Sequence, residues 1–279
     1  MSDQCKTCPS SANCTSDSNQ SGSETDKSLM GSLNNIRNVI VVMSGKGGVG
    51  KSSVTGLIAT SLARRGKKVG VLDADITGPS QPKSFGIDKA DIKATEYGII
   101  PPNTELGIKL MSINFFLPNE DDPVVWRGPL LAGAVNQFWG EVDWGDLDYM
   151  VVDLPPGTGD VPLTVMQSLP VNGIIIVSSP QDLAFMVVKK AIKMAQKMNI
   201  PILGLIENMS YAVCPHCGEK LEIFGENQGE KVARETEVEF LGSLPWDISF
   251  NILVDKGNIE DYSSEEVDKI VDKILEKLP

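Results

Sequence analysis

At 279 residues, the chain is long enough for one large α/β domain or two small ones. Its net charge of −12 argues against nucleic acid and anionic membranes as main partners. No apolar run approaches the length of a membrane span, and the N-terminus lacks the apolar stretch of a secretory signal, so we expect no membrane partner and a cytoplasmic protein.

Residues 1–35 are rich in Ser, Asn, Asp and Thr and contain almost no apolar side chains. We expect a disordered or loosely tethered arm, followed by one folded domain over residues 36–279. The arm carries Cys5, Cys8 and Cys14, with the spacing C-x2-C-x5-C. Because such an arm cannot bury thiols, these are better read as metal ligands than as packing residues, although three are one short of a tetrahedral site.

From residue 36 onward, strand-like and helix-like patterns alternate. This alternation predicts a doubly wound, mainly parallel sheet with helices on both faces. The expected strands cover residues 39–43, 68–72, 109–113, 149–153, 173–178, 202–206 and 239–244. The expected helices cover 52–65, a segment around 130–138, 182–198 with Asp182 as its cap, and 265–278, whose acidic outer face should leave its apolar stripe to dock on the core.

A glycine-rich loop, S-G-K-G-G-V-G-K-S-S, lies between the first expected strand and helix and satisfies the phosphate-loop (P-loop) pattern G-x-x-x-x-G-K-[ST]. The glycines let backbone N–H groups point at phosphate oxygens, and the following helix favours anions at its start. Lys51 can reach the β- and γ-phosphates of ATP, and the Ser52 hydroxyl can bind magnesium. The predicted nucleotide contacts here are Ser44, Gly45, Lys46, Gly47, Gly48, Val49, Gly50, Lys51, Ser52 and Ser53.

Two acidic segments follow expected strands, at the edge where open α/β sheets place their ligands. One contains Asp73 and Asp75. We expect Asp75 to orient or deprotonate the attacking water and Asp73 to support magnesium, although the assignment between them stays open. The other strand ends at Asp153, the Walker B position, which would hold magnesium through water. The glycines of residues 154–160 could then sense the γ-phosphate.

Three residues near the ends of later strands complete the predicted nucleotide site. Asn208 has an amide suited to the edge of adenine, and Pro245 and Asp247 follow the last strand. All three would lie at the same sheet edge as the phosphate loop.

Cys214 and Cys217 form a C-P-H-C pair just after the Asn208 segment. Two thiolates are half of a tetrahedral site. The pair could be half of a zinc site completed by the N-terminal cysteines, a redox dithiol, or half of a site completed by the same pair of a second subunit. Sulfur ligands alone do not separate zinc from an iron–sulfur cluster.

Lys46 at the start of the loop resembles the early lysine of the deviant Walker A class, K-G-G-x-G-K-[ST]. That class includes partition, septum-site, nitrogenase-reductase-like and iron–sulfur carrier ATPases. The resemblance implies that Lys46 reaches the partner's nucleotide across a nucleotide-dependent homodimer, which adds it to Lys51 and Asp75 as a catalytic residue.

Four segments together resemble the Mrp/ApbC family of iron–sulfur cluster carrier ATPases: W-R-G-P at 126–129, D-L-P-P-G-T-G-D at 153–160, E-N-M-S at 207–210 and C-P-H-C-G at 214–218. The resemblance runs from about residue 38 to the C-terminus. It implies that Cys214 and Cys217 of two subunits share a labile [4Fe–4S] cluster. The N-terminal cysteines are similar to the last three ligands of a four-cysteine ferredoxin-like motif in some members, which would make them an accessory metal site.

We therefore expect a homodimer that binds ATP and Mg²⁺, hydrolyses ATP slowly, and carries a [4Fe–4S] cluster to apoproteins. An alternative is a partition or septum-site type positioning ATPase with a structural zinc at the cysteine pair. That group needs no cysteine pair, and its membrane form would want a basic C-terminal helix. A nitrogenase-reductase-like electron donor is a third option, but its cluster cysteines lie near the middle of the chain, where this chain has none.

Overall fold

The computed structural model describes residues 34–75, 80–87, 92–95, 98–116, 128–180 and 182–279. This part of the chain contains a seven-stranded sheet with the order β11-β8-β7-β1-β6-β2-β5. Every pairing in that sheet is parallel. The predicted doubly wound parallel sheet is confirmed, with β1 (Asn35–Ser44), β2 (Val69–Asp73), β5 (Lys109–Ser112), β6 (Asp146–Asp153), β7 (Gly173–Ser178), β8 (Ile202–Glu207) and β11 (Phe240–Ser243).

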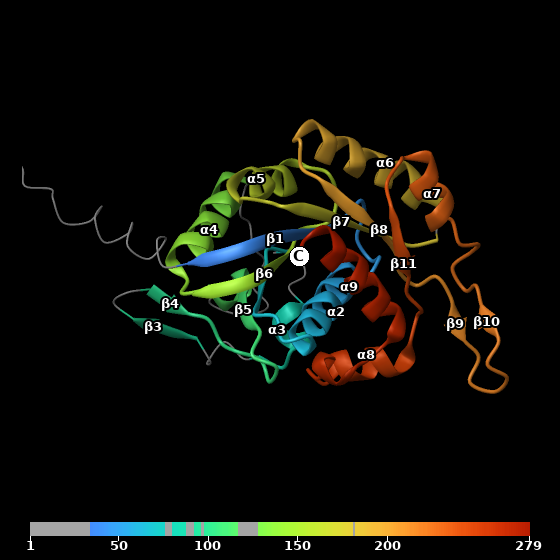
Figure 1. Ribbon diagram of the computed structural model, residues 1–279, viewed down its shortest axis with the longest axis horizontal. Helices are drawn as coiled ribbons and strands as arrows, with labels where there is room; N and C mark the ends of the chain where they lie inside the picture. Colours follow the sequence, from blue (N-terminus) through green and yellow to red (C-terminus); the bar gives the residue numbers. More distant parts are fainter. Residues whose placement is uncertain (1–33, 76–79, 88–91, 96–97, 117–127, 181) are drawn as a thin grey trace, which may run out of the picture.

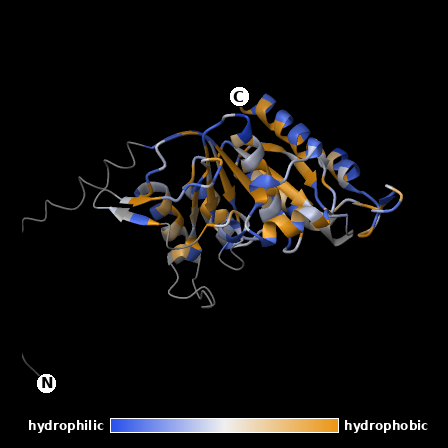
Figure 2. Ribbon diagram, turned by 90° about the horizontal axis from the view of Figure 1, so that it is seen from below, coloured by the Kyte–Doolittle hydropathy of each residue, from blue (hydrophilic) through white to orange (hydrophobic). Residues whose placement is uncertain are grey.

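Helices cover both faces of this sheet (Figure 1). One face carries α2 (Lys51–Arg64), α3 (Gln81–Ser84), α8 (Ile248–Asp255) and α9 (Glu265–Lys277), and the other carries α4 (Gly128–Glu141), α5 (Asp160–Ser168), α6 (Asp182–Lys197) and α7 (Gly229–Glu235). Strands covered on both sides read as continuous apolar runs, and every residue of β2 and of β7 is buried. Figure 2 shows the apolar strands inside and the polar faces of the outer helices turned to solvent.

The register of the central strands positions the candidate site. Asp73 of β2 pairs with Asp153 of β6, and Val42 of β1 pairs with Asp153 from the other side. The carboxyl ends of β1, β2 and β6 are therefore level, and the loops that follow them meet at one edge of the sheet.

Helix α9 docks on the core through the stripe predicted from its sequence. Val267, Ile270, Val271 and Ile274 are buried, and the Ser264 hydroxyl caps the first turn. Part of its acidic face is paired, because Asp268 and Asp272 each lie 2.8 Å from the Arg65 guanidinium at the end of α2. The ion pairs with Arg65 offset part of the negative charge of α9 where the helix meets α2.

Most predicted elements end within a few residues of their observed bounds, and the main omissions are short. Strand β6 begins at Asp146 instead of residue 149, because it pairs with β1 as far back as Asn35. The unpredicted elements are the helices α3, α5, α7 and α8, the 3-10 turns η2 (Ile113–Phe116) and η3 (Ile259–Asp261), and two small hairpins, β3 (Lys93–Thr95) with β4 (Gly98–Ile100) and β9 (Ala212–Val213) with β10 (Lys220–Leu221).

Several predictions fall outside the described residues. These include Cys5, Cys8, Cys14, Trp126, Arg127 and the side chain of Asp182. At the other end of the predicted arm, the Asn34 side chain already contacts the domain, since its amide donates to the Val142 carbonyl at 2.8 Å. Among the described helices, none is both long and apolar enough to span a bilayer.

Candidate functional site

The phosphate loop connects the end of β1 to the start of α2. Gly48 and Gly50 adopt positive φ angles of 78° and 75°, and Gly50 precedes the first helical residue, Lys51. A Cβ atom on Gly50 would lie 2.2 Å from Nδ2 of Asn208. Glycine is therefore required here twice over, by the left-handed backbone and by the neighbouring amide.

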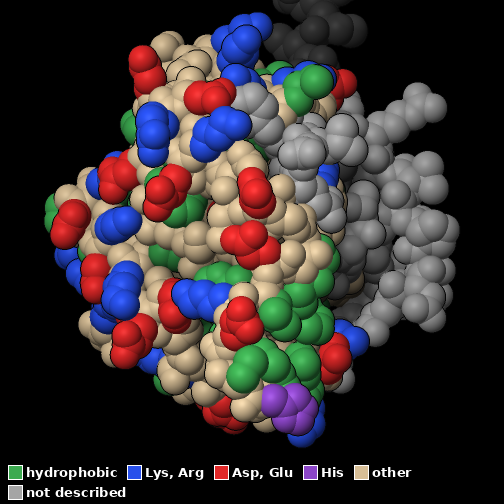
Figure 3. Space-filling view, turned by 90° about the vertical axis from the view of Figure 1, so that its right-hand side faces the viewer, with side chains coloured by type: hydrophobic (Ala, Val, Ile, Leu, Met, Phe, Trp, Pro, Cys, Tyr) green, Lys and Arg blue, Asp and Glu red, His purple; other side chains and the backbone are tan. Residues whose placement is uncertain are grey.

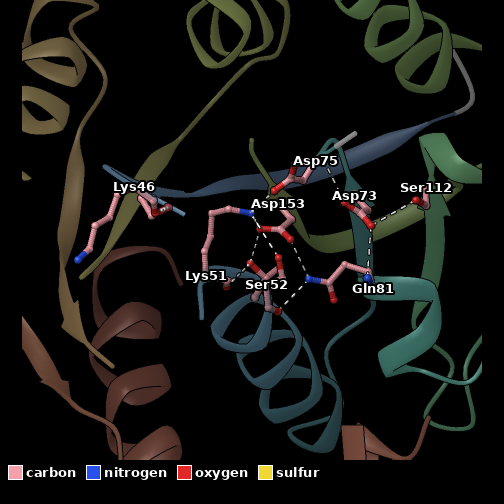
Figure 4. A network of polar contacts seen from close by, with 10 residues as sticks. Lys46, Lys51, Ser52, Asp73, Asp75, Gln81, Ser112 and Asp153 are labelled. Carbon is pink, nitrogen blue, oxygen red and sulfur yellow. Dashed lines mark hydrogen bonds and ion pairs between the residues drawn. The ribbon is translucent and has the colours of Figure 1, made fainter. Parts of the chain in front are cut away.

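Lys51 lies among carboxylates at the centre of the site (Figure 4). Its Nζ is 2.5 Å from Oδ1 of Asp153 and 3.4 Å from Oδ2 of Asp75. The same nitrogen lies 3.4 Å from the Ser52 hydroxyl. The lysine side chain is only 5% exposed, so its charge is balanced by these two acids and not by water.

Asp153 is fully buried at the end of β6 and binds three side chains. Besides Lys51, it accepts hydrogen bonds from the Thr55 hydroxyl at 3.2 Å and from Nε2 of Gln81 at 3.0 Å. Nε2 of Gln81 also donates to the Ser52 carbonyl at 2.9 Å. The Gln81 amide thus connects the Walker B acid to the start of α2.

Gln81 was not predicted as a site residue. The sequence offers only an indirect signal, Pro82, which is compatible with the first turn of a helix that starts at Gln81. The contact to Asp153 depends on how the loop after β2 folds back over α2, which local sequence does not specify.

Asp73 is also buried, at the end of β2. Its carboxylate accepts hydrogen bonds from the Asp75 backbone at 3.1 Å, the Gln81 backbone at 3.3 Å and the Ser112 hydroxyl at 3.2 Å. Burial and the nearby Asp153 carboxylate raise the pKa of Asp73 to about 8. Three acids thus share this buried region with Lys51, and the raised pKa of Asp73 lowers the negative charge that Lys51 has to balance.

This donor set suits a hard cation only in part. Among the described residues, no three His, Cys, Asp or Glu side chains are arranged so that they alone could hold a metal ion. Magnesium keeps several waters and is commonly bound by one or two carboxylates together with substrate phosphates. The residues present fit that mode, with Ser52 and Asp153 as the protein groups, and Asp73 behind them.

Lys46 lies on the other side of the loop. Figure 4 shows its side chain directed away from Lys51 and the carboxylates. The Ser44 hydroxyl donates to the Lys46 carbonyl at 2.9 Å, and the Gly157 N–H donates to the Ser44 carbonyl at 2.8 Å. The predicted sensor loop after β6 therefore contacts the phosphate loop through its backbone.

Three of the predicted nucleotide-binding residues meet beside α2. Ser53, Asn208 and Pro245 line one small cavity of about 20 Å³, together with Phe250 and Tyr262. The cavity has room for little more than one water molecule, so a base would have to open it. Asp247 caps α8, where it accepts a hydrogen bond from the Ser249 N–H at 2.7 Å.

Cys214 and Cys217 lie in the turn between β9 and β10, which projects from the edge of the domain beside β11 (Figure 1). The Cys214 N–H donates to the Glu219 carbonyl, and the Gly218 N–H donates to the Cys214 carbonyl, both at 2.9 Å. Both thiols are free, and Cys217 is exposed. Hydrogen bonds from the backbone N–H groups of Cys217 and His216, and from the Cys217 side chain, lower the pKa of Cys214.

Apolar side chains surround this turn. Val213, Leu221 and Ile223 are 53%, 45% and 54% exposed. Figure 3 shows hydrophobic side chains gathered beside the only histidine of the chain, His216. The two thiols thus lie in an exposed surface that is partly apolar, well apart in sequence from the phosphate loop.

The site residues predicted from sequence therefore form two groups in the structure. One contains the loop of residues 44–53 with Asp73, Asp75 and Asp153, bordered by Asn208 and Pro245. The other contains Cys214 and Cys217. Asn208 links them in sequence, because its Nδ2 donates to the Val49 carbonyl at 3.0 Å while its chain leads on to the cysteine turn.

Relatives of this chain are described as carriers of iron–sulfur clusters. The chain is 48% identical to an iron–sulfur cluster carrier protein of Methanocaldococcus jannaschii, over 99% of this chain and 96% of that protein. It is 46% identical to an iron–sulfur cluster carrier protein of Clostridium perfringens, over 94% of this chain and 95% of that protein.

Two solved structures are similar to this chain in fold. A nucleotide-binding protein of Archaeoglobus fulgidus, described as a complex with ADP and with cobalt, is 46% identical and superposes with a TM-score of 0.76 over 87% of this chain and 94% of that chain. The cell-division ATPase MinD of Pyrococcus furiosus has a TM-score of 0.63 over 86% of this chain and 99% of its own, but at 20% identity it shows the fold alone.

Residues 35–279 match the family model described as NUBPL iron-transfer P-loop NTPase, in the ParA group. That match includes the phosphate loop, the Walker B acid and the cysteine turn. The predicted resemblance is confirmed, and the chain belongs to the iron-transfer P-loop NTPases, together with the iron–sulfur cluster carrier proteins.

Proposed function

We propose that this protein is an ATP-dependent carrier that holds a [4Fe–4S] cluster between two copies of the chain and delivers it to apoproteins. The exposed Cys214–Cys217 turn carries the proposal. It presents two free thiols, one of them with a lowered pKa, and a cluster of this type needs about four cysteine ligands. A second copy related by two-fold symmetry would supply the other two.

The apolar surface around the turn supports this arrangement. Val213, Leu221 and Ile223 are exposed in one chain, and a partner that brought its own turn to the shared cluster would cover them. The relatives' descriptions as cluster carriers support the cargo, and the ADP complex of a 46% identical protein supports the nucleotide.

ATP would bind in the phosphate loop, with Lys51 turned from Asp153 toward the β- and γ-phosphates. Ser52 and Asp153 would hold magnesium, whose chemical contribution is to neutralise charge on the phosphates. Asp75 would orient or deprotonate the attacking water, and Lys46 would reach the partner's nucleotide. We propose slow intrinsic hydrolysis, because a carrier uses the nucleotide to change how cargo is held.

The acidic surface supports proteins as partners, since a net charge of −12 opposes binding to nucleic acid and to anionic membranes. A cytoplasmic location agrees with this proposal. The positioning-ATPase alternative shares the fold, but it gives no role to an exposed pair of thiols surrounded by apolar side chains.

Anaerobic reconstitution with iron and sulfide tests the proposal. A Cys5→Ser/Cys8→Ser/Cys14→Ser variant should take up about two irons per chain, the share of one [4Fe–4S] cluster in a dimer, and should elute at twice the monomer mass. A Cys214→Ser/Cys217→Ser variant should lose this cluster. Iron that follows the N-terminal cysteines instead would contradict the assignment.

A further inference from the structure

The segment that carries the cysteines leaves the domain and returns to it at one buried carboxylate. This cysteine segment, residues 208–228, runs from the end of β8 to the start of α7. Glu207, the last residue of β8, is 2% exposed. Its Oε1 accepts hydrogen bonds from the backbone N–H groups of Gln228 at 2.9 Å and Gly229 at 2.7 Å, so it binds the returning end.

The other carboxylate oxygen of Glu207 binds the outgoing end. Oε2 accepts a hydrogen bond from the Ser210 hydroxyl at 3.2 Å. In the amide orientation that satisfies both groups, Nδ2 of Asn227 donates to this oxygen at 3.2 Å and to the Ser210 carbonyl at 3.0 Å. One side chain therefore ties both ends of the segment together, with all of its contacts inside the protein.

The outgoing end also lies against the phosphate loop. The Asn208 amide donates to the Val49 carbonyl at 3.0 Å. Met209 has a φ of 58°, in a region that non-glycine residues rarely adopt, and its Cε would lie 3.4 Å from a Cβ built on Gly50. The Asn208 N–H donates to the Ser178 carbonyl and the Ser210 N–H donates to the Leu244 carbonyl, which places the outgoing end beside the ends of β7 and β11.

We propose that Glu207 is a positioning residue that makes the cysteine segment respond to the nucleotide. Asn208 and Met209 contact the phosphate loop, so a change there on nucleotide binding moves the outgoing end. Because Glu207 ties that end to the returning end, the segment moves as one piece and the Cys214–Cys217 turn is reoriented. The inference deepens the proposed carrier function by naming how the nucleotide would regulate the cysteine site.

Hydrogen exchange of the metal-free, full-length protein tests this inference without any cluster. MgADP should change the exchange rate of backbone amides in residues 212–221 of the wild type by about fivefold or more, which is the lower end of typical coupling between sites. Glu207→Ala should abolish that change, while calorimetry on the same sample shows that MgADP still binds. Glu207→Gln keeps a carbonyl acceptor for the two backbone N–H groups and should restore most of the response.

Two further variants keep the test decisive. Glu226→Ala removes an exposed acid from the same segment and should respond as the wild type does. Met209→Gly leaves the Glu207 contacts in place but removes the side chain next to Gly50, and should weaken the response even if Glu207→Ala fails to fold. A wild-type response that persists in Glu207→Ala would overturn the inference.

If wild-type protein binds MgADP and the exchange rate of residues 212–221 does not change, the inference is also overturned. Either result leaves the carrier function to be decided by reconstitution. Loss of cluster binding, in turn, would not affect the exchange measurement, so the two proposals fail separately.

Discussion

Lys51 has two alternative partners, the carboxylates of its own site and the phosphates of ATP. In the structure its ammonium group lies against the buried carboxylates of Asp153 and Asp75, and in the proposed ATP complex it binds phosphate. The same side chain therefore contributes to the stability of the fold and to nucleotide affinity. The effect of a mutation at Lys51 should therefore be measured on both stability and nucleotide affinity.

Lys51→Ala should abolish ATP binding and lower the free energy of unfolding of the nucleotide-free protein by about 3–5 kcal/mol, because removing one partner of a buried ion pair leaves uncompensated charge. Calorimetry and urea unfolding measure the two effects. Adding Asp153→Asn to Lys51→Ala should recover part of the stability and none of the binding. Wild-type stability in the single variant would show that the ion pair does not form in solution.

The protonation of Asp73 should make stability depend on pH. Its pKa is raised from 3.8 to about 8 in the folded protein, mainly by burial, so the folded chain holds this proton more tightly than the unfolded chain. The proton on Asp73 therefore adds to the free energy of unfolding. This stabilisation is complete below the unfolded pKa of 3.8 and is lost as the pH rises through about 8. Urea unfolding should show that the free energy of unfolding of the wild type falls between pH 5 and 8, and that it falls less in Asp73→Asn. The same dependence on pH in both proteins would contradict this assignment to Asp73.

The sequence predicted site residues best where a short local pattern has one known role. The phosphate-loop pattern and the acid at the end of a strand were enough to place Lys51, Ser52 and Asp153 together. Gln81 and Glu207 could not be assigned this way, because their roles come from long-range contacts to Asp153 and to Gln228. A buried amide or carboxylate that joins two segments has no local pattern.

The hairpin of β9 and β10 holds both cysteines of the cysteine site in its turn. Its strands are only two residues long, and the turn between them directs backbone N–H groups at the Cys214 sulfur. Pairing this short was not predicted, since two-residue strands carry no alternating apolar pattern. The long buried strands, in contrast, were found as apolar runs.

Cys214 should ionise more readily than an ordinary cysteine. In a variant with Cys5, Cys8, Cys14 and Cys217 replaced by serine, the pH midpoint for alkylation by iodoacetamide should lie below the pKa of an ordinary cysteine, about 8.5. The backbone N–H groups of residues 216 and 217 remain to stabilise the thiolate. Unfolding the same variant in urea should raise the midpoint, and an unchanged midpoint would show that the fold does not activate this thiol.

At the scale of the whole molecule, the alternation of strands and helices was enough to predict the parallel sheet. The order of its strands was not, because it depends on crossovers such as the one from β2 through β5 to β6. The proposed dimer also lies beyond single-chain geometry. Lys46 is directed away from the acids of its own site, as Figure 4 shows, which is compatible with a role toward a second chain.

Mixed dimers test that role. Lys51→Ala removes ATP binding from its own chain, and Lys46→Ala removes the residue proposed to act on the partner's nucleotide. Mixing the two variants should give heterodimers in which the Lys46→Ala chain binds ATP and the Lys51→Ala chain supplies Lys46, so turnover should exceed that of either variant alone. Turnover equal to the average of the separate variants would count against action across the dimer.

The tie at Glu207 has an evolutionary consequence. Because the two ends of the cysteine segment meet at one carboxylate, we expect that the part of the segment beyond Tyr211 can be lost or gained without disturbing the sheet on either side. Insertion of such a loop after a strand would add cargo binding to an ATPase, and a short linker in place of residues 212–226 should leave a folded, nucleotide-binding domain. The same segment, transplanted with its glutamate into a protein of this fold that carries no metal, would bring a thiol pair already connected to the nucleotide site.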